Sequence, residues 1–270
     1  MYAFLAPKTL EDARGFLESR PNLKLLAGGT DLIIGLREGL VTPDAVMDVK
    51  QIPALTQIRQ TEDVLEIGAA VTVDEMLRSG YLSGPYHALY EAGEELANIL
   101  LRNRATLAGN ICNASPGGDM LPACLVLDAW VETIRPDGGR RIPLREFFMG
   151  PKRHVLASDE MVVKTVFPRA AGKSAYRKKK RIRGHDLAQV GVAGLLGADG
   201  ALTLAFGACG PTPICLDVFD TNTQSRAEIL DAAMNGIAPI GDVRASKEHR
   251  QEMARYLTEA VLDAIEEVRV

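Results

Sequence analysis

Several signatures of self-contained chemistry are missing from this 270-residue chain. No two of its 25 glycines are separated by a single residue, so a GxGxxG dinucleotide-binding turn is absent. The four cysteines form no CxxC pair and the four histidines form no HExxH, which argues against zinc or iron–sulfur ligation. No serine stands in a GxSxG turn, and Phe167 occupies the first glycine position of a P-loop that would end in Gly172-Lys173-Ser174. The sequence therefore shows no acid–base or nucleophile machinery of its own.

Long apolar runs and a strong charge of one sign are also missing. The longest uncharged stretch, Gly200 to Leu216, is interrupted by glycines and two prolines, so no membrane span is expected. The formal charge of −4 argues against binding of the whole chain to nucleic acid or another polyanion. The first residues lack a charged leader before an apolar run, and the four cysteines are typical of free thiols in a reducing compartment. We therefore expect a cytoplasmic location.

What is present is the pattern of a mixed α and β protein. A composition of 47% apolar and 24% charged residues is typical of a folded chain. Period-2 and helical patterns, together with turn residues, predict the elements. We expect strands at 23–26, 45–49, 64–70, 131–135, 161–167, 175–181, 189–196 and 201–206. We expect helices at 10–17 (capped by Thr9), from Asp31, at 74–78, 85–97, 120–129 and, through a repeat that ends at Val268, 244–268.

The first candidate site is a glycine turn that follows a predicted strand. It consists of Leu25-Leu26-Ala27-Gly28-Gly29-Thr30-Asp31-Leu32. Paired glycines let successive N–H groups point into one concavity, the helix that follows adds the positive end of its dipole, and Thr30 adds a hydroxyl donor. Such a turn suits a phosphate group. An ordinary strand-to-helix turn has the same composition, so this segment alone leaves both interpretations open.

The second candidate site spans 106–119 and is interpreted as a long loop ahead of the helix at 120–129. Its residues are Thr106-Leu107-Ala108-Gly109-Asn110-Ile111-Cys112-Asn113-Ala114-Ser115-Pro116-Gly117-Gly118-Asp119. A solvent loop does not need Leu107 and Ile111, whereas a loop pressed against a ligand does. Its polar groups suit a second phosphate, and Asp119 can accept from a ribose hydroxyl, although a purely structural loop remains the alternative. Two phosphate-suited loops without GxGxxG indicate a dinucleotide bound across its pyrophosphate by a non-Rossmann fold.

The third feature is the basic run from Arg177 to Arg183. If 175–182 is a strand, alternate cations lie on opposite faces, so at most about half can face one ligand. One interpretation is a solvated edge strand that is protected by charge against aggregation. The other is that one or two cations stabilise an anionic reduced flavin or attract an acidic partner.

Five segments carry a resemblance to a known family. They are LLAGGTDL at 25–32, RNRATLAGNICNASPGGD at 102–119, AYRKKKRIRGHDLAQVGVA at 175–193, LAFGACGPTPI at 204–214 and RASKEHR at 244–250. The first three resemble the FAD-binding (medium) subunit of the xanthine dehydrogenase family of molybdenum hydroxylases. The last two look like the C-terminal flavoprotein domain of that family, so the resemblance covers essentially the whole chain.

The resemblance implies an α+β fold with FAD as the cofactor. A two-part FAD-binding domain of the vanillyl-alcohol-oxidase (PCMH) type would span 1–170, with its two parts divided near 50–60. A smaller α+β C-terminal flavoprotein domain of the carbon monoxide dehydrogenase type would span 171–270. Proline, glycine and charge cluster at 168–173, where we also place a boundary on composition alone.

The resemblance also implies which residues contact FAD. Two pyrophosphate loops are implied, formed by Leu25, Leu26, Ala27, Gly28, Gly29, Thr30, Asp31 and Leu32 and by Thr106, Leu107, Ala108, Gly109 and Asn110. Ser115 and Asp119 are implied along the ribityl and adenosine part. Further FAD positions are implied at Leu96, Val162 and one cation, Arg177 or Lys178, while Tyr176 and Asp186 are implied near the flavin ring.

The chain departs from the family pattern at Ala108. The second motif commonly reads Thr/Ser-x-Gly-Gly-Asn, and Ala108 replaces its first glycine. The extra methyl is tolerable if the backbone φ there is negative and damaging if it must be positive. In hydroxybenzoyl-CoA reductases the equivalent subunit carries a cysteine-rich insert that holds a [4Fe–4S] cluster. Here Cys112 continues directly into Asn113-Ala114-Ser115-Pro116, so no such cluster is expected.

The function that the resemblance implies is an electron relay. A large partner would hold the molybdenum cofactor and hydroxylate the substrate, and a small [2Fe–2S] partner would pass electrons to FAD in this chain. FAD would deliver them to NAD⁺ or another acceptor, in an assembly expected to be a dimer of heterotrimers. The missing catalytic motifs fit this role because the cofactor does the chemistry. Two alternatives stay open: a self-contained flavin-dependent reductase on the same fold, which would reduce FAD without partners, and a non-redox nucleotide-binding module, which would not be yellow.

Overall fold

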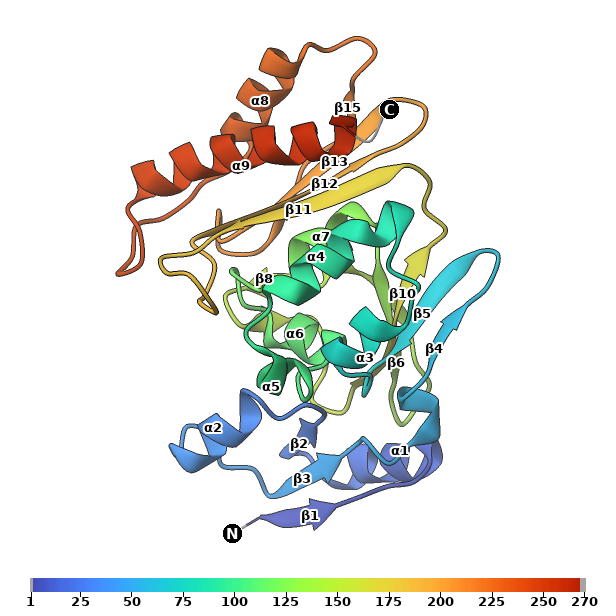
Figure 1. The fold of residues 1–270 in the computed structure, drawn as a ribbon. Coiled ribbons are helices and arrows are strands. Elements are labelled where there is room, and N and C mark those ends of the chain that lie inside the picture. The colour runs from blue at the N-terminus through green and yellow to red at the C-terminus, as the bar shows by residue number, and fades with distance from the viewer. Residues whose placement is uncertain (1, 268–270) are drawn as a thin grey trace.

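The computed structural model of the chain describes residues 2–267, in which three β-sheets are stacked one above another (Figure 1). The first sheet is parallel, with strand order β1-β3-β2. Its unit contains β1 (Ala3–Leu5), α1 (Leu10–Ser19), β2 (Leu23–Leu26), α2 (Leu32–Arg37) and β3 (Ala45–Asp48). The Thr9 hydroxyl accepts from the Asp12 N–H and caps α1, as the sequence predicts.

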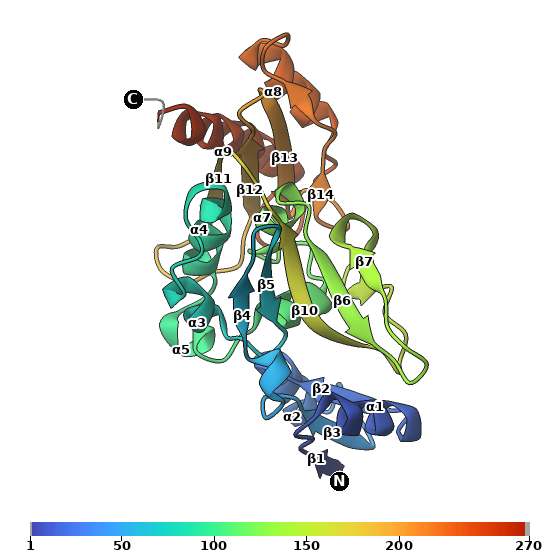
Figure 2. The same cartoon turned by 90° about the vertical axis from the view of Figure 1, so that its right-hand side faces the viewer.

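The second sheet is antiparallel, with order β4-β5-β10-β6-β7. Helices α3, α4 and α5 lie to one side of it (Figure 2). Its strands are β4 (Ile58–Gln60), β5 (Val64–Gly68), β6 (Trp130–Ile134), β7 (Arg141–Pro143) and β10 (Met161–Pro168). The other elements of this central unit are α3 (Val73–Arg78), α4 (His87–Glu95), α5 (Ile99–Arg102), α6 (Leu107–Asn113), α7 (Leu121–Val126), the 3-10 turns Pro53–Leu55, Gly84–Tyr86 and Leu144–Glu146, and the hairpin β8 (Phe148–Gly150) and β9 (Arg153–His154).

The third sheet lies between the helix α9 on one face and α4 with α7 on the other (Figure 1). It contains β11 (Lys173–Lys179), β12 (Val190–Leu196), β13 (Ala201–Gly207), β14 (Ile214–Cys215) and β15 (Phe219–Asp220), followed by α8 (Arg226–Asn235) and α9 (Lys247–Glu267). Side chains alternate between the two faces of its strands. Ala175, Val192 and Leu204 join the core under α8 and α9, whereas Tyr176, Ala193 and Ala205 join the core of the central unit.

The mixed helix and sheet content confirms the predicted α+β class, and each predicted strand is present with small changes at its ends. The prediction of a loop over 106–119 was wrong for its first half, because Thr106 caps the helix α6. The predicted helix at 85–97 begins with a 3-10 turn and ends at Glu95, and the last helix starts at Lys247. Val268 lies outside the described residues. Among the helices of residues 2–267, none has the length and apolar character needed to cross a bilayer.

Candidate functional site

The first glycine turn connects β2 to α2, as the sequence predicts. A Cβ on Gly28 would lie 2.2 Å from the Arg104 carbonyl oxygen and 2.9 Å from the Ala105 Cα, so only glycine fits there without a backbone shift. Gly29 has a φ of +76°, which also favours glycine. Within residues 2–267 the N–H groups of Gly29 and Thr30 donate no hydrogen bond. The turn therefore presents free N–H donors beside a tightly packed backbone.

The second segment supplies donors from the start of α6. The Thr106 hydroxyl accepts from the Gly109 N–H at 2.9 Å and so caps the helix. Ala108 lies in the first helical turn, where φ is negative, and its methyl is buried in the core of the central unit. The alanine that replaces the usual glycine is thus accommodated by the backbone. The Ala108 N–H finds no acceptor among the residues that the structure describes.

The fold brings the two segments together. Besides the contact of Gly28 with the backbone that leads into Thr106, the Asn113 side-chain amide donates to Asp31 Oδ1 at 3.3 Å. Figure 1 shows β2 and α2 below α5 and α6. Donors that are about 80 residues apart in sequence therefore converge between the N-terminal and central units.

Asn110 carries a buried polar atom without a partner. Its Oδ1 is shielded from solvent and accepts no hydrogen bond within the described part of the chain. An orphaned buried oxygen costs about 1–3 kcal/mol, which a bound donor recovers. This atom and the free N–H groups match the chemistry of a dinucleotide pyrophosphate and its neighbouring hydroxyls.

A buried ion pair lies at the far end of the same segment. Lys178 on β11 has no exposed side-chain surface, and its ammonium is 2.8 Å from Asp119 Oδ1 and 3.0 Å from the Glu95 carbonyl oxygen. Burial raises the pKa of Asp119 to about 6, against the lowering effect of Lys178. Tyr176, two residues earlier on the same face, has a buried hydroxyl with no partner in the described chain. Burial and the charge of Asp119 raise its pKa well above the ordinary value.

The remaining predicted residues are more scattered. Leu96 follows α4 and is buried, with its carbonyl accepting from Arg102 at 3.2 Å. Val162 is buried on β10, where the register with β6 shifts. The Ser115 carbonyl closes a turn by accepting from the Gly118 N–H. Asp186 binds Arg181 and the Leu187 N–H in its own turn, which holds the pKa of Asp186 to about 2, and these contacts do not join it to the glycine turns.

The basic run is not the solvated strand of the first interpretation, and the second interpretation, contact with a flavin or an acidic partner, stays a prediction. Strand β11 ends at Lys179, so Lys180 lies beyond it, and Lys178 is buried rather than solvated. Arg177 pairs with Glu91 and Lys180 with Glu95, both on α4. Neither acid was among the predicted site residues, although their spacing of four residues on a predicted helix places them on one face. These partners neutralise Arg177, one of the two cations named for FAD, and Lys180, which was not named for it.

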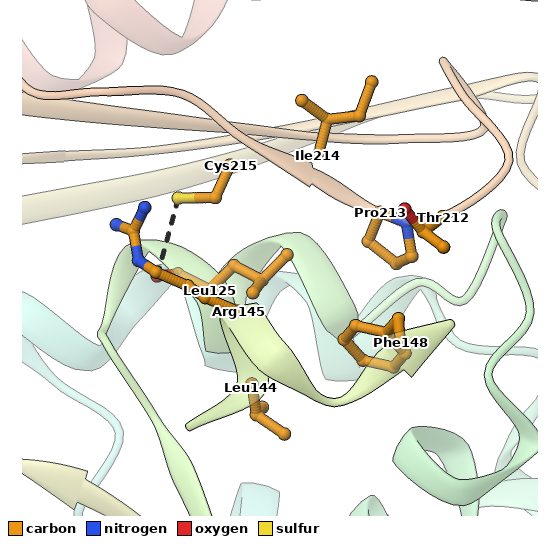
Figure 3. A pocket seen from close by; sticks show the side chains of 8 residues that line it. All are labelled: Leu125, Leu144, Arg145, Phe148, Thr212, Pro213, Ile214 and Cys215. Carbon is orange, nitrogen blue, oxygen red and sulfur yellow. Dashed lines mark hydrogen bonds between the residues drawn. The ribbon is translucent and has the colours of Figure 1, made fainter. Parts of the chain in front are cut away.

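The thiols and the cavities lie outside this chemistry. Burial raises the pKa of Cys112 to about 12, so this thiol stays protonated near neutral pH. A hollow of about 270 Å³ lies between α7, the Leu144–Glu146 turn and β14, where Arg145 and Cys215 face Phe148 across apolar side chains (Figure 3). A second hollow of about 560 Å³ is lined by the β4–β5 turn and by Tyr81 and Arg169. Neither hollow is lined by a predicted FAD contact.

Comparisons with known proteins agree with the geometry. Residues 1–170 match the family described as "FAD binding domain in molybdopterin dehydrogenase". The xanthine dehydrogenase FAD-binding subunit of Escherichia coli O157:H7 is 33% identical over 269 residues, covering 94% of this chain and 92% of that protein. The nicotinate dehydrogenase FAD-subunit of Eubacterium barkeri is 34% identical over 188 residues, covering 67% and 64%. A chain of CO dehydrogenase from Oligotropha carboxidovorans superposes with a TM-score of 0.90 at 25% identity, covering 98% and 97%.

Proposed function

The chain belongs to the FAD-binding domain family of the molybdopterin dehydrogenases, and from this premise we propose that it is the electron-relay subunit of a heteromeric molybdenum hydroxylase. It is an oxidoreductase component whose cofactor is FAD. The observation that carries the proposal is the convergence of the two predicted pyrophosphate segments, with Gly28 against the Arg104–Ala105 backbone. Large and small partner subunits would hold the molybdenum cofactor and the [2Fe–2S] clusters.

This chain's residues have separable tasks in binding. The N–H groups of Gly29, Thr30 and Ala108 would hold the pyrophosphate, and Asn110 Oδ1 would accept from a neighbouring hydroxyl. FAD, when bound, supplies the step between one-electron and two-electron transfer. Apart from the Asp31 carboxylate, which accepts from Asn113, the polar groups that the two segments present are N–H, hydroxyl and amide groups, which suit binding rather than bond cleavage.

The buried pair of Asp119 and Lys178 would supply an acceptor and a donor to the same cofactor. An ammonium has three N–H donors; that of Lys178 donates to the Glu95 carbonyl and forms an ion pair with Asp119, so at least one donor stays for a ligand. Asp119 Oδ1 is buried and accepts no hydrogen bond within the described residues, so this oxygen can accept from a ligand donor. Of the two cations named from the sequence, Lys178 is the one we propose for FAD, because it lies beside Asp119 of the second candidate segment, whereas Arg177 is paired with Glu91 on α4. Leu96, Val162 and Ser115 stay proposed FAD contacts, and Asp186 a proposed neighbour of the flavin ring.

The finer features of the relay follow from the same proposal. Electrons would reach FAD from the small partner and leave to NAD⁺ or another acceptor, in a dimer of heterotrimers located in the cytoplasm. The two relatives named above support the division of labour, since one is a FAD-binding subunit and the other a FAD-subunit of a dehydrogenase.

The experiment is purification of the protein from its native host, with an absorption spectrum and a denaturing gel of the preparation. We expect oxidised-flavin bands, iron–sulfur absorbance, and one larger and one smaller polypeptide. A lone yellow polypeptide that oxidises a nicotinamide cofactor would replace the relay with the self-contained reductase. A colourless polypeptide that takes up no FAD would overturn both.

An Asn110→Ala substitution should weaken FAD binding without destabilising the FAD-free protein. Removing the orphaned oxygen should leave the free energy of unfolding of the FAD-free protein unchanged or raise it by about 1 kcal/mol. Loss of an acceptor should weaken FAD binding about ten-fold. Urea unfolding and quenching of flavin fluorescence measure the two quantities. Asn103→Ala, at an exposed residue after α5, is the matched control and should leave FAD affinity unchanged. Weaker binding with equal destabilisation of the FAD-free protein would contradict a binding role for Asn110.

A further inference from the structure

The carboxylate of Glu91 on α4 is bound to the backbone of β11 as well as to a side chain. Its Oε2 accepts from the Tyr176 N–H at 2.7 Å, and its Oε1 pairs with the Arg177 guanidinium at 2.5 Å. Strand β11 is the edge of its sheet, and α4 lies along it (Figure 1). An edge strand exposes a row of N–H groups that no neighbouring strand satisfies. Glu91 therefore fixes the position of this strand against the central unit.

The anchored point is close to the buried ammonium. Tyr176 and Lys178 are two residues apart, so their side chains share a strand face and their Cα atoms are about 7 Å apart. Both side chains are buried on the face toward the central unit. A buried ion pair offsets its desolvation only with good geometry, so the contact of Lys178 with Asp119 depends on where β11 lies.

We infer that Glu91 is a positioning residue, which holds β11 so that Lys178 stays beside Asp119 at the FAD site. The inference rests on the proposed function, because it assigns the Asp119–Lys178 pair to the cofactor. Glu91 acts through the Tyr176 N–H and touches neither member of the pair itself. The effect of Glu91 on the position of β11 should therefore depend on an oxygen acceptor at residue 91 more than on the negative charge of the side chain.

This role has a pH signature. The charged groups that act on Asp119 are Lys178 from β11, Lys180 just beyond that strand and Glu95 from α4, and Asp119 in turn raises the pKa of Tyr176. The carboxylate of Asp119 is the acceptor that we propose for FAD, so FAD affinity should fall as the pH falls through the Asp119 pKa of about 6. Lys178 lowers that pKa, so a displaced Lys178 should let the midpoint of the affinity profile move to higher pH.

The test compares variants of the full-length chain, freed of FAD and titrated with FAD from pH 5 to 8. Glu91→Ala should bind FAD about ten-fold more weakly at pH 7, with its pH midpoint moved upward. Glu91→Gln keeps an oxygen for the Tyr176 N–H, so its FAD affinity should stay within about two-fold of that of the natural chain. Glu94→Ala removes an acid from the same helix at an exposed position and is the matched control, with no expected effect.

Three outcomes decide the matter. Affinity and midpoint in Glu91→Ala equal to those in Glu94→Ala would overturn the positioning role. Weaker binding with an unmoved midpoint would also overturn it, because general destabilisation then explains the loss. A natural chain that takes up no FAD at any pH would overturn the proposed function itself, together with this inference.

Discussion

A Gly28→Ala variant is expected to lose at least about 100-fold in FAD affinity, roughly 2.7 kcal/mol of binding free energy. The new methyl would lie 2.2 Å from the Arg104 carbonyl oxygen and 2.8 Å from the Arg104 carbonyl carbon. Both are backbone atoms, so the β2–α2 turn and the segment that leads into Thr106 must move apart. That movement separates the two proposed pyrophosphate segments. Titration of the FAD-free chain by flavin fluorescence measures the loss.

The matched control is Gly15→Ala in α1. No atom lies within 4 Å of a Cβ built on Gly15, and alanine favours a helix over glycine by about 1 kcal/mol. This variant should bind FAD normally and unfold at an equal or higher temperature. Gly28→Ala should itself cost about 1–3 kcal/mol of stability as an overpacked site. If the Gly28 variant bound FAD as tightly as the Gly15 variant, the turn would not be the pyrophosphate loop.

Elements with strong local signals could be predicted from the sequence. Thr9 precedes a stretch with apolar residues at helical spacing, and the structure shows the helix and its cap hydrogen bond. The segment 23–26, with three leucines, leads through Ala27 into paired glycines, and it forms β2. In both cases the residues that determine the element lie within it, so no distant contact is needed to predict it.

Other elements depend on contacts that no local pattern reveals. Strand β1 is three residues long and leaves Phe4 60% exposed, so it shows no alternation, and its pairing with β3 defines it. Helix α8 was missed because its apolar side chains include small alanines and give little amphipathic signal. The capping box between Ser225 and Glu228 could have revealed it.

The candidate site was predictable in its parts and not in its assembly. Both glycine segments could be recognised in the sequence. The helix α6 could not, because Gly109, Asn110 and Asn113 disfavour a helix, and the cap at Thr106 overcomes this. The contact of Gly28 with Arg104 depends on the tertiary fold. The tertiary fold also decides which cations pair with acids on α4 and which lysine is buried, because charge alone shows neither.

The division of the chain at residue 170 stays a prediction about independent folding units. The family match ends at this residue, and β11 begins just after it. The face of the third sheet that carries Tyr176, Ala193 and Ala205 packs into the central core. We therefore propose that residues 171–270 form a unit that buries one sheet face on the FAD-binding unit.

Replacement of Lys178 by methionine should destabilise the FAD-free chain strongly at alkaline pH and much less at acidic pH. The change leaves the buried Asp119 carboxylate without its cation, and removal of one partner of a buried pair costs about 3–5 kcal/mol. The pKa of Asp119 is about 6 in the folded chain, above its ordinary value of 3.8. The folded state therefore binds the proton more tightly, and the free energy of unfolding falls as the pH rises from about 4 through 6. Without Lys178 the pKa of Asp119 rises further, so this decrease continues to higher pH.

The difference between Lys178→Met and the natural chain should therefore be about 3–5 kcal/mol at pH 8 and less than about half of that at pH 5, where Asp119 is protonated. Urea unfolding at the two pH values measures it. Lys179→Met removes the same charge from the opposite face of β11, where the side chain is only partly buried. Its free energy of unfolding should stay within about 0.5 kcal/mol of that of the natural chain at both pH values. A loss at Lys178 that is independent of pH would mean that packing of the side chain, rather than pairing with Asp119, stabilises this part of the fold. In that event the pair could not be the charged acceptor and donor that we assign to FAD, and the Tyr176 hydroxyl, buried without a partner, would become the first polar group to test in its place.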